Sequence, residues 1–410
     1  RVVSGDQTGY AYSEITTMSQ MEKAAKTAAQ IASQPNKHIH IPAHITPLPC
    51  GTFYPVVQGW DDVSISYKIP YLQQLNTLIF EGDSRVVKVT ARISDSNTKI
   101  LFCNSLGDHF ADERPMVSVI ASCIMEKTGR TENGSSSRSY RMGFELLTDT
   151  LIKELAAEVI ARTAFLFDAS QPKGGQMPVV MGSGSSGILL HEAVGHAFEA
   201  DFNRKNTSIF ADKMGQQICN RAINIVDDGT ITANRGSCNF DDEGVAGQKI
   251  YMVKDGILHS YLHDRISAKF YGVSPTGNGR RESFRYMPIP RMRATYMESG
   301  MAKEDDIIAS VKKGIYVDNF SNGQVQIGAG DFTFYVKSGY LIEKGKLTRP
   351  IKDINIIGNG PQALEDILAV ADNNKIENAT WTCGKEQYCP VSCGMPSVLV
   401  KKLTVGGINE

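Results

Sequence analysis

Three observations predict an α+β protein, with an N-terminal helix-and-antiparallel-sheet region followed by a β-rich C-terminal domain of barrel-like antiparallel sheets. Helical periodicity is confined to a few segments of the 410-residue chain. Runs rich in β-branched and aromatic residues, separated by polar or glycine turns, fill residues 86–141 and most of the chain beyond 176. The linker-like segment "QPKGG" at 171–175 separates the helix-containing first part of the chain from the β-rich second part. We therefore expect an N-terminal α+β region at 1–172 and a β-rich C-terminal domain at 173–410.

The first region is predicted to contain three helices and a meander. An alanine-rich segment after Ser13 predicts a helix over 13–33, and apolar spacing predicts two more over 66–82 and 146–170. Four β-rich runs between the second and third helices predict an antiparallel meander. The alternation around three histidines predicts a strand face and favours no metal role for them, since no cysteine or carboxylate pattern accompanies them: His38, His40 and His44.

The second region is predicted to be mostly antiparallel. A short buried strand at 177–183 precedes a helix at 188–202. Asp228-Gly229, Asp255-Gly256 and Lys344-Gly345 each lie between apolar runs, which predicts tight hairpins. A further helix is expected at 360–372.

Composition narrows the class of function. Lys plus Arg (43) balance Asp plus Glu (44), so no overall field favours direct binding of nucleic acid or of an anionic membrane. No apolar run is long enough to span a bilayer. Eight cysteines are too few for a disulfide scaffold and suggest a reducing, cytoplasmic compartment. The chain opens at Arg1 rather than Met, so we expect residues to precede it.

The stretch "GSGSSGILLHEAVGH" (182–196) is the strongest chemical signal. His191 and His196 are five residues apart, which on a regular α-helix separates them by about 140° and prevents a shared metal ion. A π-bulge would return both imidazoles to one face, and Gly195 offers an alternative by letting the backbone leave helical geometry. A metal site here therefore predicts a bulge or break near Val194-Gly195.

Glu192 favours the metal interpretation over a helix with two structural histidines. A carboxylate beside a metal-ligating histidine can take a proton from the attacking water and pass it to a leaving amine. The "GSGSSG" segment is no P-loop, because no Gly-Lys-Ser/Thr follows it. We expect it to form a flexible turn with free N–H groups at the helix N-terminus, with contact to substrate backbone as an alternative.

Two histidines leave a catalytic zinc site one protein ligand short. Glu199 and Asp201 are nearby candidates, although such carboxylates more often lie on the surface. The other candidates are the three C-terminal cysteines, of which one thiolate would complete an N₂S donor set: Cys383, Cys389 and Cys393. Spacing does not choose among them.

Several longer motifs, in the same order, resemble the TldD branch of the TldD/PmbA metalloprotease family. The similarity runs along the whole chain and is densest beyond residue 180. The motifs are "GILLHEAVGHAFEADFNRKNTSIF", "DDEGVAGQ", "SPTGNGRRESFRYMPIPRM", "NGQVQIGAGDF" and "CGKEQYCPVSCGMPSVLVKKLTVGG".

The resemblance implies a zinc peptidase of the His-Glu-x-x-x-His type. It assigns one zinc ion to His191, His196 and Cys383, and the role of general base to Glu192. It also implies cytoplasmic trimming of unfolded peptides or small proteins by a homodimer, or by a hetero-dimer with a silent PmbA/TldE-like subunit. The chain departs from the family pattern at Cys389 and Cys393, which we interpret as structural.

Three arginines of the third motif could contact a substrate carboxylate or a partner, or form surface ion pairs: Arg280, Arg281 and Arg291. Tyr286 and His263 are candidates for oxyanion stabilisation, with neither assigned. Two alternative functions stay open. One is a non-catalytic regulatory subunit, like relatives described as modulators of DNA gyrase, and the other is a metal-dependent amidase acting on a small molecule.

Overall fold

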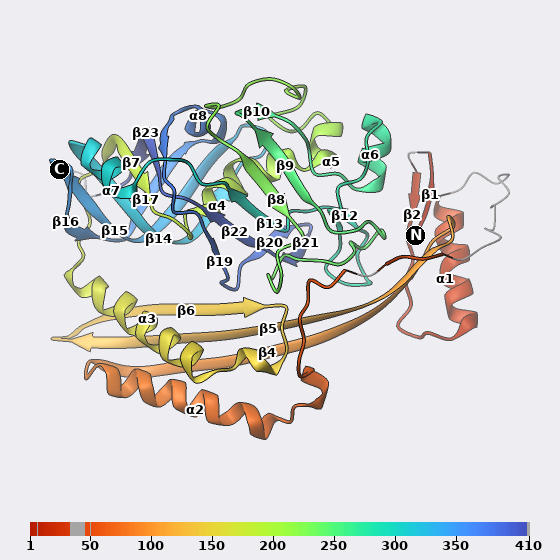
Figure 1. The fold of residues 1–410 in the computed structure, drawn as a ribbon, viewed down its shortest axis with the longest axis horizontal. Coiled ribbons are helices and arrows are strands. Elements are labelled where there is room, and N and C mark those ends of the chain that lie inside the picture. Colours follow the sequence, from red (N-terminus) through yellow and green to blue (C-terminus); the bar gives the residue numbers. More distant parts are fainter. Residues whose placement is uncertain (6, 33–45, 50, 408–410) are drawn as a thin grey trace.

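The computed structural model describes residues 1–5, 7–32, 46–49 and 51–407. A long antiparallel sheet with two helices beneath it forms one layer, and a β-rich body lies above this layer (Figure 1). The α+β class and the β-rich C-terminal region are therefore confirmed. The boundary expected at residue 172 stays a prediction.

The N-terminal region is built around one meander. The strands β4 (Val86–Cys103), β5 (Asp108–Lys127) and β6 (Arg130–Tyr140) pair antiparallel in sequence order, which confirms the predicted meander, although its first two runs form the single strand β4. The remaining elements are β1 (Val2–Ser4), β2 (Gln7–Gly9), α1 (Met18–Ile31), β3 (Thr46–Pro47), η1 (Trp60–Asp62), α2 (Ile65–Gly82), η2 (Phe144–Leu146) and α3 (Asp149–Asp168).

Alternation along β5 explains how this layer holds together. Val117, Val119 and Ala121 point to one face and are fully buried. They pack with apolar residues of α2 and α3, such as Leu75 and Leu155. The predicted helices 66–82 and 146–170 are thus confirmed, because each supplies the apolar stripe that this sheet face needs.

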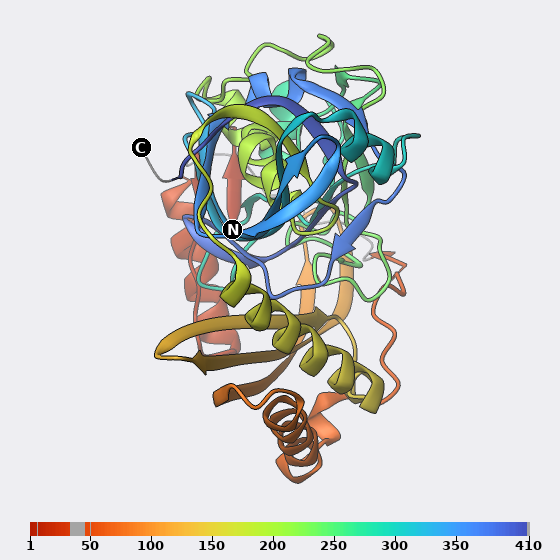
Figure 2. The ribbon, with the colours of Figure 1, turned by 90° about the vertical axis from the view of Figure 1, so that its left-hand side faces the viewer.

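A closed five-stranded barrel forms the centre of the C-terminal body (Figure 2). Its strands pair in the order β14 (Lys313–Val325), β7 (Gly175–Met181), β23 (Val398–Val405), β17 (Ile354–Asn359) and β15 (Asp331–Glu343), and β15 pairs back with β14. All of these pairings are antiparallel except β14 with β7. Two outer strands attach to the barrel: β16 (Lys346–Ile351) and β18 (Ile367–Val370).

A second, six-stranded sheet lies beside the barrel. Its order is β10 (Ile257–Leu258), β9 (Lys249–Lys254), β8 (Ile225–Asp228), β13 (Ala294–Met297), β22 (Ser392–Met395) and β19 (Lys375–Glu377), with β13 and β22 parallel. Two small hairpins accompany it: β11 (Gly279–Arg280) with β12 (Ile289–Pro290), and β20 (Thr382–Lys385) with β21 (Gln387–Pro390). The helices of this body are α4 (Gly187–Leu190), η3 (His191–Gly195), η4 (His196–Phe198), α5 (Ala200–Arg204), α6 (Arg265–Tyr271), α7 (Glu304–Ser310) and α8 (Gly360–Glu365).

Two of the three predicted hairpins are confirmed. Asp255-Gly256 connects β9 to β10 and Lys344-Gly345 connects β15 to β16, and all four residues have the positive φ of a type I′ turn. The prediction of a tight hairpin at Asp228-Gly229 is wrong, because the next strand that pairs with β8 is β9, which begins only at Lys249.

The predicted helix at 360–372 is only half correct. Helix α8 ends at Glu365, and 367–370 form strand β18 instead, because pairing with β23 overrides the local helical pattern. The first helix begins at Met18 rather than Ser13. His38, His40 and His44 lie outside the described residues.

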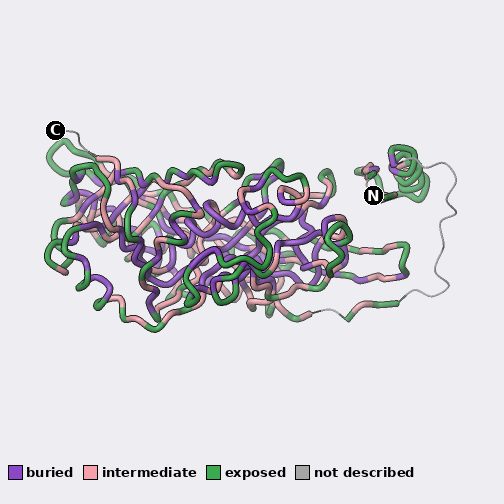
Figure 3. The backbone as a smooth tube through the Cα atoms, turned by 90° about the horizontal axis from the view of Figure 1, so that it is seen from above, coloured by how far each residue is buried: buried purple, intermediate pink, exposed green. Residues whose placement is uncertain are grey.

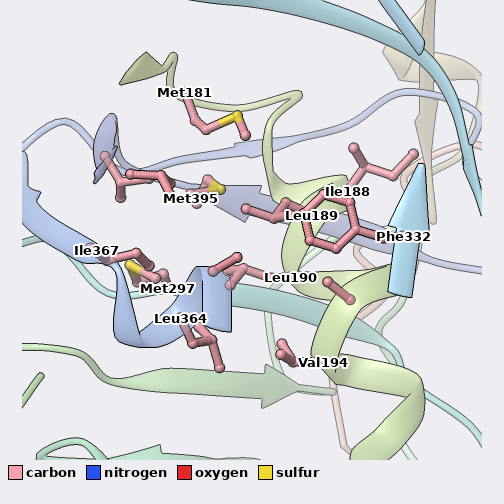
Figure 4. Close-up of a cluster of buried hydrophobic side chains, with 14 of the residues drawn as sticks. Met181, Ile188, Leu189, Leu190, Val194, Met297, Phe332, Leu364, Ile367 and Met395 are labelled. Atoms are coloured by element: carbon pink, nitrogen blue, oxygen red, sulfur yellow. The ribbon is translucent and has the colours of Figure 1, made fainter. Parts of the chain in front are cut away.

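The short helix α4 is held in the main hydrophobic cluster (Figure 4). Leu189, Leu190 and Val194 are buried among side chains from the barrel and from α8, including Phe332 and Leu364. Burying one such side chain stabilises a fold by about 1.5–3 kcal/mol. The segment that carries the His-Glu pair is therefore fixed by the core.

Exposure increases towards the N-terminal end of the molecule. Helix α1 lies apart from the densely buried body and is mostly exposed (Figure 3). None of the helices in the described ranges is both long and apolar enough to cross a membrane.

Candidate metal centre

The predicted bulge lies between the two histidines. After α4 the chain forms a single π-helical turn, η3, in which the backbone N–H of His196 donates to the carbonyl oxygen of His191. This bond spans the same five residues that separate the two imidazoles. The ring centroids lie 5.1 Å apart. The extra residue therefore brings the histidines together rather than apart.

Gly195 plays a different part from the one expected. Its φ of −59° and ψ of −49° are ordinary helical values, so the backbone does not leave helical geometry there. A Cβ at this position would lie 2.2 Å from Sδ of Met292. The turn packs directly against the buried Met292 side chain, which would have to shift to admit a larger residue than glycine.

Cys383 completes a three-residue cluster. The candidate ligand atoms of His191, His196 and Cys383 all lie within 4.8 Å of one another, and all three residues are buried. Sγ of Cys383 is 3.2 Å from Nε2 of His196. The structure thus selects one of the three C-terminal cysteines as the neighbour of the histidines. Cys389 and Cys393 are not part of the cluster.

The donor atoms fit a metal ion. Among the residues that the structure describes, neither buried ring nitrogen of His191 has a hydrogen-bond partner, which is costly unless something else binds them. Burial raises the pKa of Cys383, but the two neighbouring imidazoles outweigh it and lower the pKa to about 4, so that the sulfur is a thiolate. Two imidazoles and a thiolate form a donor set typical of zinc.

Glu192 is the solvent-facing member of this group. Its Oε2 lies 3.9 Å from Nε2 of His196, and its side chain keeps 22% of its exposure while the histidine is buried. A carboxylate in this position can exchange protons with water beside the cluster.

Glu199 and Lys385 support His196 from behind. Oε2 of Glu199 is 2.9 Å from Nδ1 of His196, and Nζ of Lys385 lies 3.1 Å from the same carboxylate and 2.7 Å from Oδ1 of Asp201. Burial raises the pKa of Glu199, but Lys385 and His196 lower it to about 2. Glu199 is fully buried, so the expectation of a surface carboxylate is wrong for it, and it contacts a ligand instead of acting as one.

The hairpin β20–β21 delivers two of these groups. Cys383 and Lys385 alternate with the exposed Gly384, so both point inward from the same strand. The side chain of Arg291 donates to the carbonyl oxygens of Cys383 (2.7 Å) and Gln387 (2.8 Å), and so ties the two strands together.

The structure also places the other residues that the sequence singled out. Arg280 and Arg291 are buried and donate to backbone carbonyls, so neither is a surface ion pair or is placed to meet a substrate. Arg281 is half-buried and donates to the hydroxyl of Tyr10. His263 is buried against the rings of Tyr261 and Tyr271.

The "GSGSSG" segment is pinned rather than flexible. The N–H groups of Gly182 and Gly184 donate to Val317 and Met395, and the hydroxyl of Ser185 donates to the carbonyl of Asp318. Every residue of the segment is buried except Ser183, which is half-buried. The predicted contact with substrate backbone stays a prediction.

Of the two supporting groups, sequence reasoning named Glu199 only as a candidate ligand, and it missed Lys385 altogether. Two signals could have found them: Glu199 follows His196 by three residues, and Lys385 shares a strand face with Cys383.

Family models match most of the chain. The PmbA/TldA metallopeptidase central domain covers residues 59–164, and the PmbA/TldA metallopeptidase C-terminal domain covers 174–407. The chain belongs to the TldD/PmbA metalloprotease family.

Individual TldD/PmbA relatives agree with this assignment. A metalloprotease TldD homolog of Haemophilus influenzae is 40% identical over 415 aligned residues, covering 100% of this chain and 86% of the relative. A metalloprotease of Methanocaldococcus jannaschii is 34% identical over 313 aligned residues, covering 76% of this chain and 68% of the relative.

Two solved structures share the fold. A protein from Thermotoga maritima, described as a candidate modulator of a DNA gyrase, gives a TM-score of 0.77 at 22% identity and covers 98% of this chain and 87% of that one. TldE from Thermococcus kodakarensis gives a TM-score of 0.74 at 18% identity and covers 98% of this chain and 88% of that one.

Proposed function

We propose that this TldD/PmbA metalloprotease is a zinc-dependent peptidase that hydrolyses unfolded peptides or small proteins with little side-chain selectivity. His191, His196 and Cys383 would hold one zinc ion, and Glu192 would act as the general base. The observation that carries the proposal is the convergence of two imidazoles and a thiolate within 4.8 Å, with the partly exposed carboxylate of Glu192 beside them.

The chemistry follows from the donor set. Bound zinc would supply a Lewis acid that polarises the scissile carbonyl and makes nearby water more acidic. Glu192 would take the proton of the attacking water and return it to the leaving amine. Glu199 would hold the proton on Nδ1 of His196 and leave Nε2 free as a ligand.

Low selectivity follows from binding through the main chain. An extended peptide that pairs with a sheet edge is held by backbone hydrogen bonds, which are the same for every sequence. Folded proteins have no free strand to offer, so they would be excluded.

The proposed assembly is a homodimer or a hetero-dimer with a PmbA/TldE-like subunit, and the likeness to TldE supports the latter. We also propose a cytoplasmic location, on the sparse cysteines, and a catalytic domain at 173–410. A gyrase-modulating role has weaker support, because the Thermotoga likeness is one of fold and the net charge of −1 favours no DNA contact. An amidase acting on a small molecule would use the same residues, so substrate choice decides that alternative.

The test combines metal content with cleavage. Purified protein should carry about one zinc per chain and cleave a random peptide mixture, and a chelator should abolish cleavage reversibly. Glu192→Gln should keep the metal and lose cleavage by a factor of about 10² or more.

A matched carboxylate separates this result from a general loss of charge. Glu377→Gln replaces a half-buried glutamate that is not a member of the cluster and should retain both metal and activity. Activity that persists in Glu192→Gln, or in metal-free protein, would overturn the proposal.

A further inference from the structure

We propose that Cys383 and Cys389 form a reversible disulfide that removes the thiolate from the metal cluster, which makes this pair a redox modification site. The two cysteines are direct partners in the register of the β20–β21 hairpin. The consequence of the disulfide rests on the proposed metal site. Formation of the bond in metal-free protein does not depend on that site.

Both thiols point to the same side of the hairpin. Residues directly opposite in an antiparallel pair project their side chains to one face. Here Cys383 and Cys389 are buried, whereas Gly384 and Tyr388, between them in the hairpin, are exposed. The pair therefore lies on the inner face, beside His196.

The spacing suits a disulfide without movement of the strands. Opposed residues of an antiparallel pair have Cα atoms about 4.5 to 5.5 Å apart. Disulfides need about 4.4 to 6.8 Å. The Cα–Cα distance therefore permits a disulfide whether the two cysteines form a hydrogen-bonded or a non-hydrogen-bonded pair of the ladder.

Arg291 holds this arrangement in place. Its guanidinium is fully buried and donates to a carbonyl of each strand, at Cys383 and at Gln387. The strands cannot separate without breaking these bonds, so Cys383 and Cys389 stay opposite one another in the ladder.

A hydroperoxide is the oxidant that the site would take. The Cys383 thiolate attacks one peroxide oxygen, the O–O bond breaks, and the sulfenic acid and hydroxide form. The Cys389 sulfur then attacks the sulfenic sulfur, the S–O bond breaks, and its thiol proton leaves with the hydroxyl group as water. Two thiols have lost two electrons to the peroxide, and a dithiol returns them by exchange.

The disulfide would disable the site without unfolding it. Two histidines alone leave a catalytic zinc site short of a ligand. Reduction would restore the thiolate in a hairpin that has kept its shape. The pair therefore acts as a switch between metal-binding and metal-free chains.

Peptide mapping and zinc binding test the proposal together. Chelator-treated protein is exposed to hydrogen peroxide, mapped by mass spectrometry, and titrated with Zn²⁺ before and after a dithiol. We expect one cross-linked peptide joining residues 383 and 389, loss of most Zn²⁺ binding, and recovery of that binding with the dithiol.

Two variants sharpen the result. In Cys389→Ala, excess peroxide should carry Cys383 to the sulfinic acid, so its mass rises by two oxygen atoms and the dithiol restores nothing. Cys393→Ala removes another buried cysteine, outside the pair, and should behave as the unaltered protein. Cys389→Ser serves in place of Cys389→Ala should the alanine variant fold poorly.

The proposal is overturned if no peptide joins 383 to 389, or if Cys389→Ala recovers Zn²⁺ binding as fully as the unaltered protein. A cross-link in a chain that binds no Zn²⁺ even before oxidation would instead count against the proposed function and leave the redox pair standing.

Discussion

Nδ1 of His196 and Oε2 of Glu199 lie 2.9 Å apart inside the protein. The carboxylate is fully buried and ionised, because Lys385 and His196 outweigh the burial that raises its pKa and lower it to about 2. An ionised acceptor at Nδ1 keeps the proton on that nitrogen. Nε2, 3.2 Å from the sulfur of Cys383, is therefore the nitrogen that would release its proton and bind a metal ion.

Glu199→Gln should weaken metal binding about 10- to 100-fold, since it removes the charge that orients and polarises His196. The dissociation constant for Zn²⁺, measured by competition with a chelator, checks this. Asp201→Asn is the matched control, because Asp201 accepts from Lys385 but contacts neither histidine. An unchanged constant in Glu199→Gln would show that the contact has no role in metal binding.

Cys383→Ala should lose most of the bound zinc, because two imidazoles remain as ligands. Metal analysis of protein purified without added zinc provides the measurement. Cys393→Ala, at another buried cysteine outside the cluster, should retain about one zinc per chain. Retention of zinc by Cys383→Ala would place the third ligand elsewhere.

Local pattern was enough to predict the scaffold. Alternation along β5 and the helical stripes of α2 and α3 predict the first layer, because each depends on a period that a short window reveals. The sequence pattern did not predict the strand at 367–370, because this segment is a strand only through its pairing with Val398–Val400, which is remote in sequence. The hairpin predicted at Asp228-Gly229 is wrong for the same reason, since β8 pairs with β9, whose first residue is Lys249 and not a residue next to the Asp-Gly pair.

The spacing of the two histidines in the sequence predicted only part of the site. Helix geometry alone required a bulge if His191 and His196 were to share an ion, and the π turn supplies it. Nothing in the spacing could choose Cys383, because its approach depends on how a hairpin docks on the helix. The family resemblance provided that assignment. The burial of Glu199 could not be predicted from the sequence either, since its salt bridge with Lys385 joins segments far apart in the chain.

Gly195→Ala should lower the free energy of unfolding by about 1–3 kcal/mol, because its Cβ would overlap Sδ of Met292 in a filled core. Met292→Ala should relieve part of that loss, which a double-mutant cycle on the thermal midpoint would measure. Gly59→Ala, where a Cβ meets nothing closer than 3.8 Å, is the control and should be nearly neutral. Additive effects of the Gly195 and Met292 changes would contradict the proposed overlap.

His263 should make the fold sensitive to acid. Burial lowers its pKa from 6.5 to about 4, so between these values the unfolded chain binds a proton that the folded chain does not. The stabilising contribution is complete above pH 6.5 and is lost as the pH falls towards 4, by on the order of 3 kcal/mol. His263→Phe keeps an aromatic ring against Tyr261 and Tyr271, and removes a ring nitrogen, Nδ1, that has no hydrogen-bond partner in the described part of the chain. The variant should therefore show a flatter fall of its thermal midpoint between pH 7 and pH 4, whereas His259→Phe, at an exposed position, should follow the unaltered protein. Parallel curves for His263→Phe and the unaltered protein would mean that His263 takes up its proton without opening the structure.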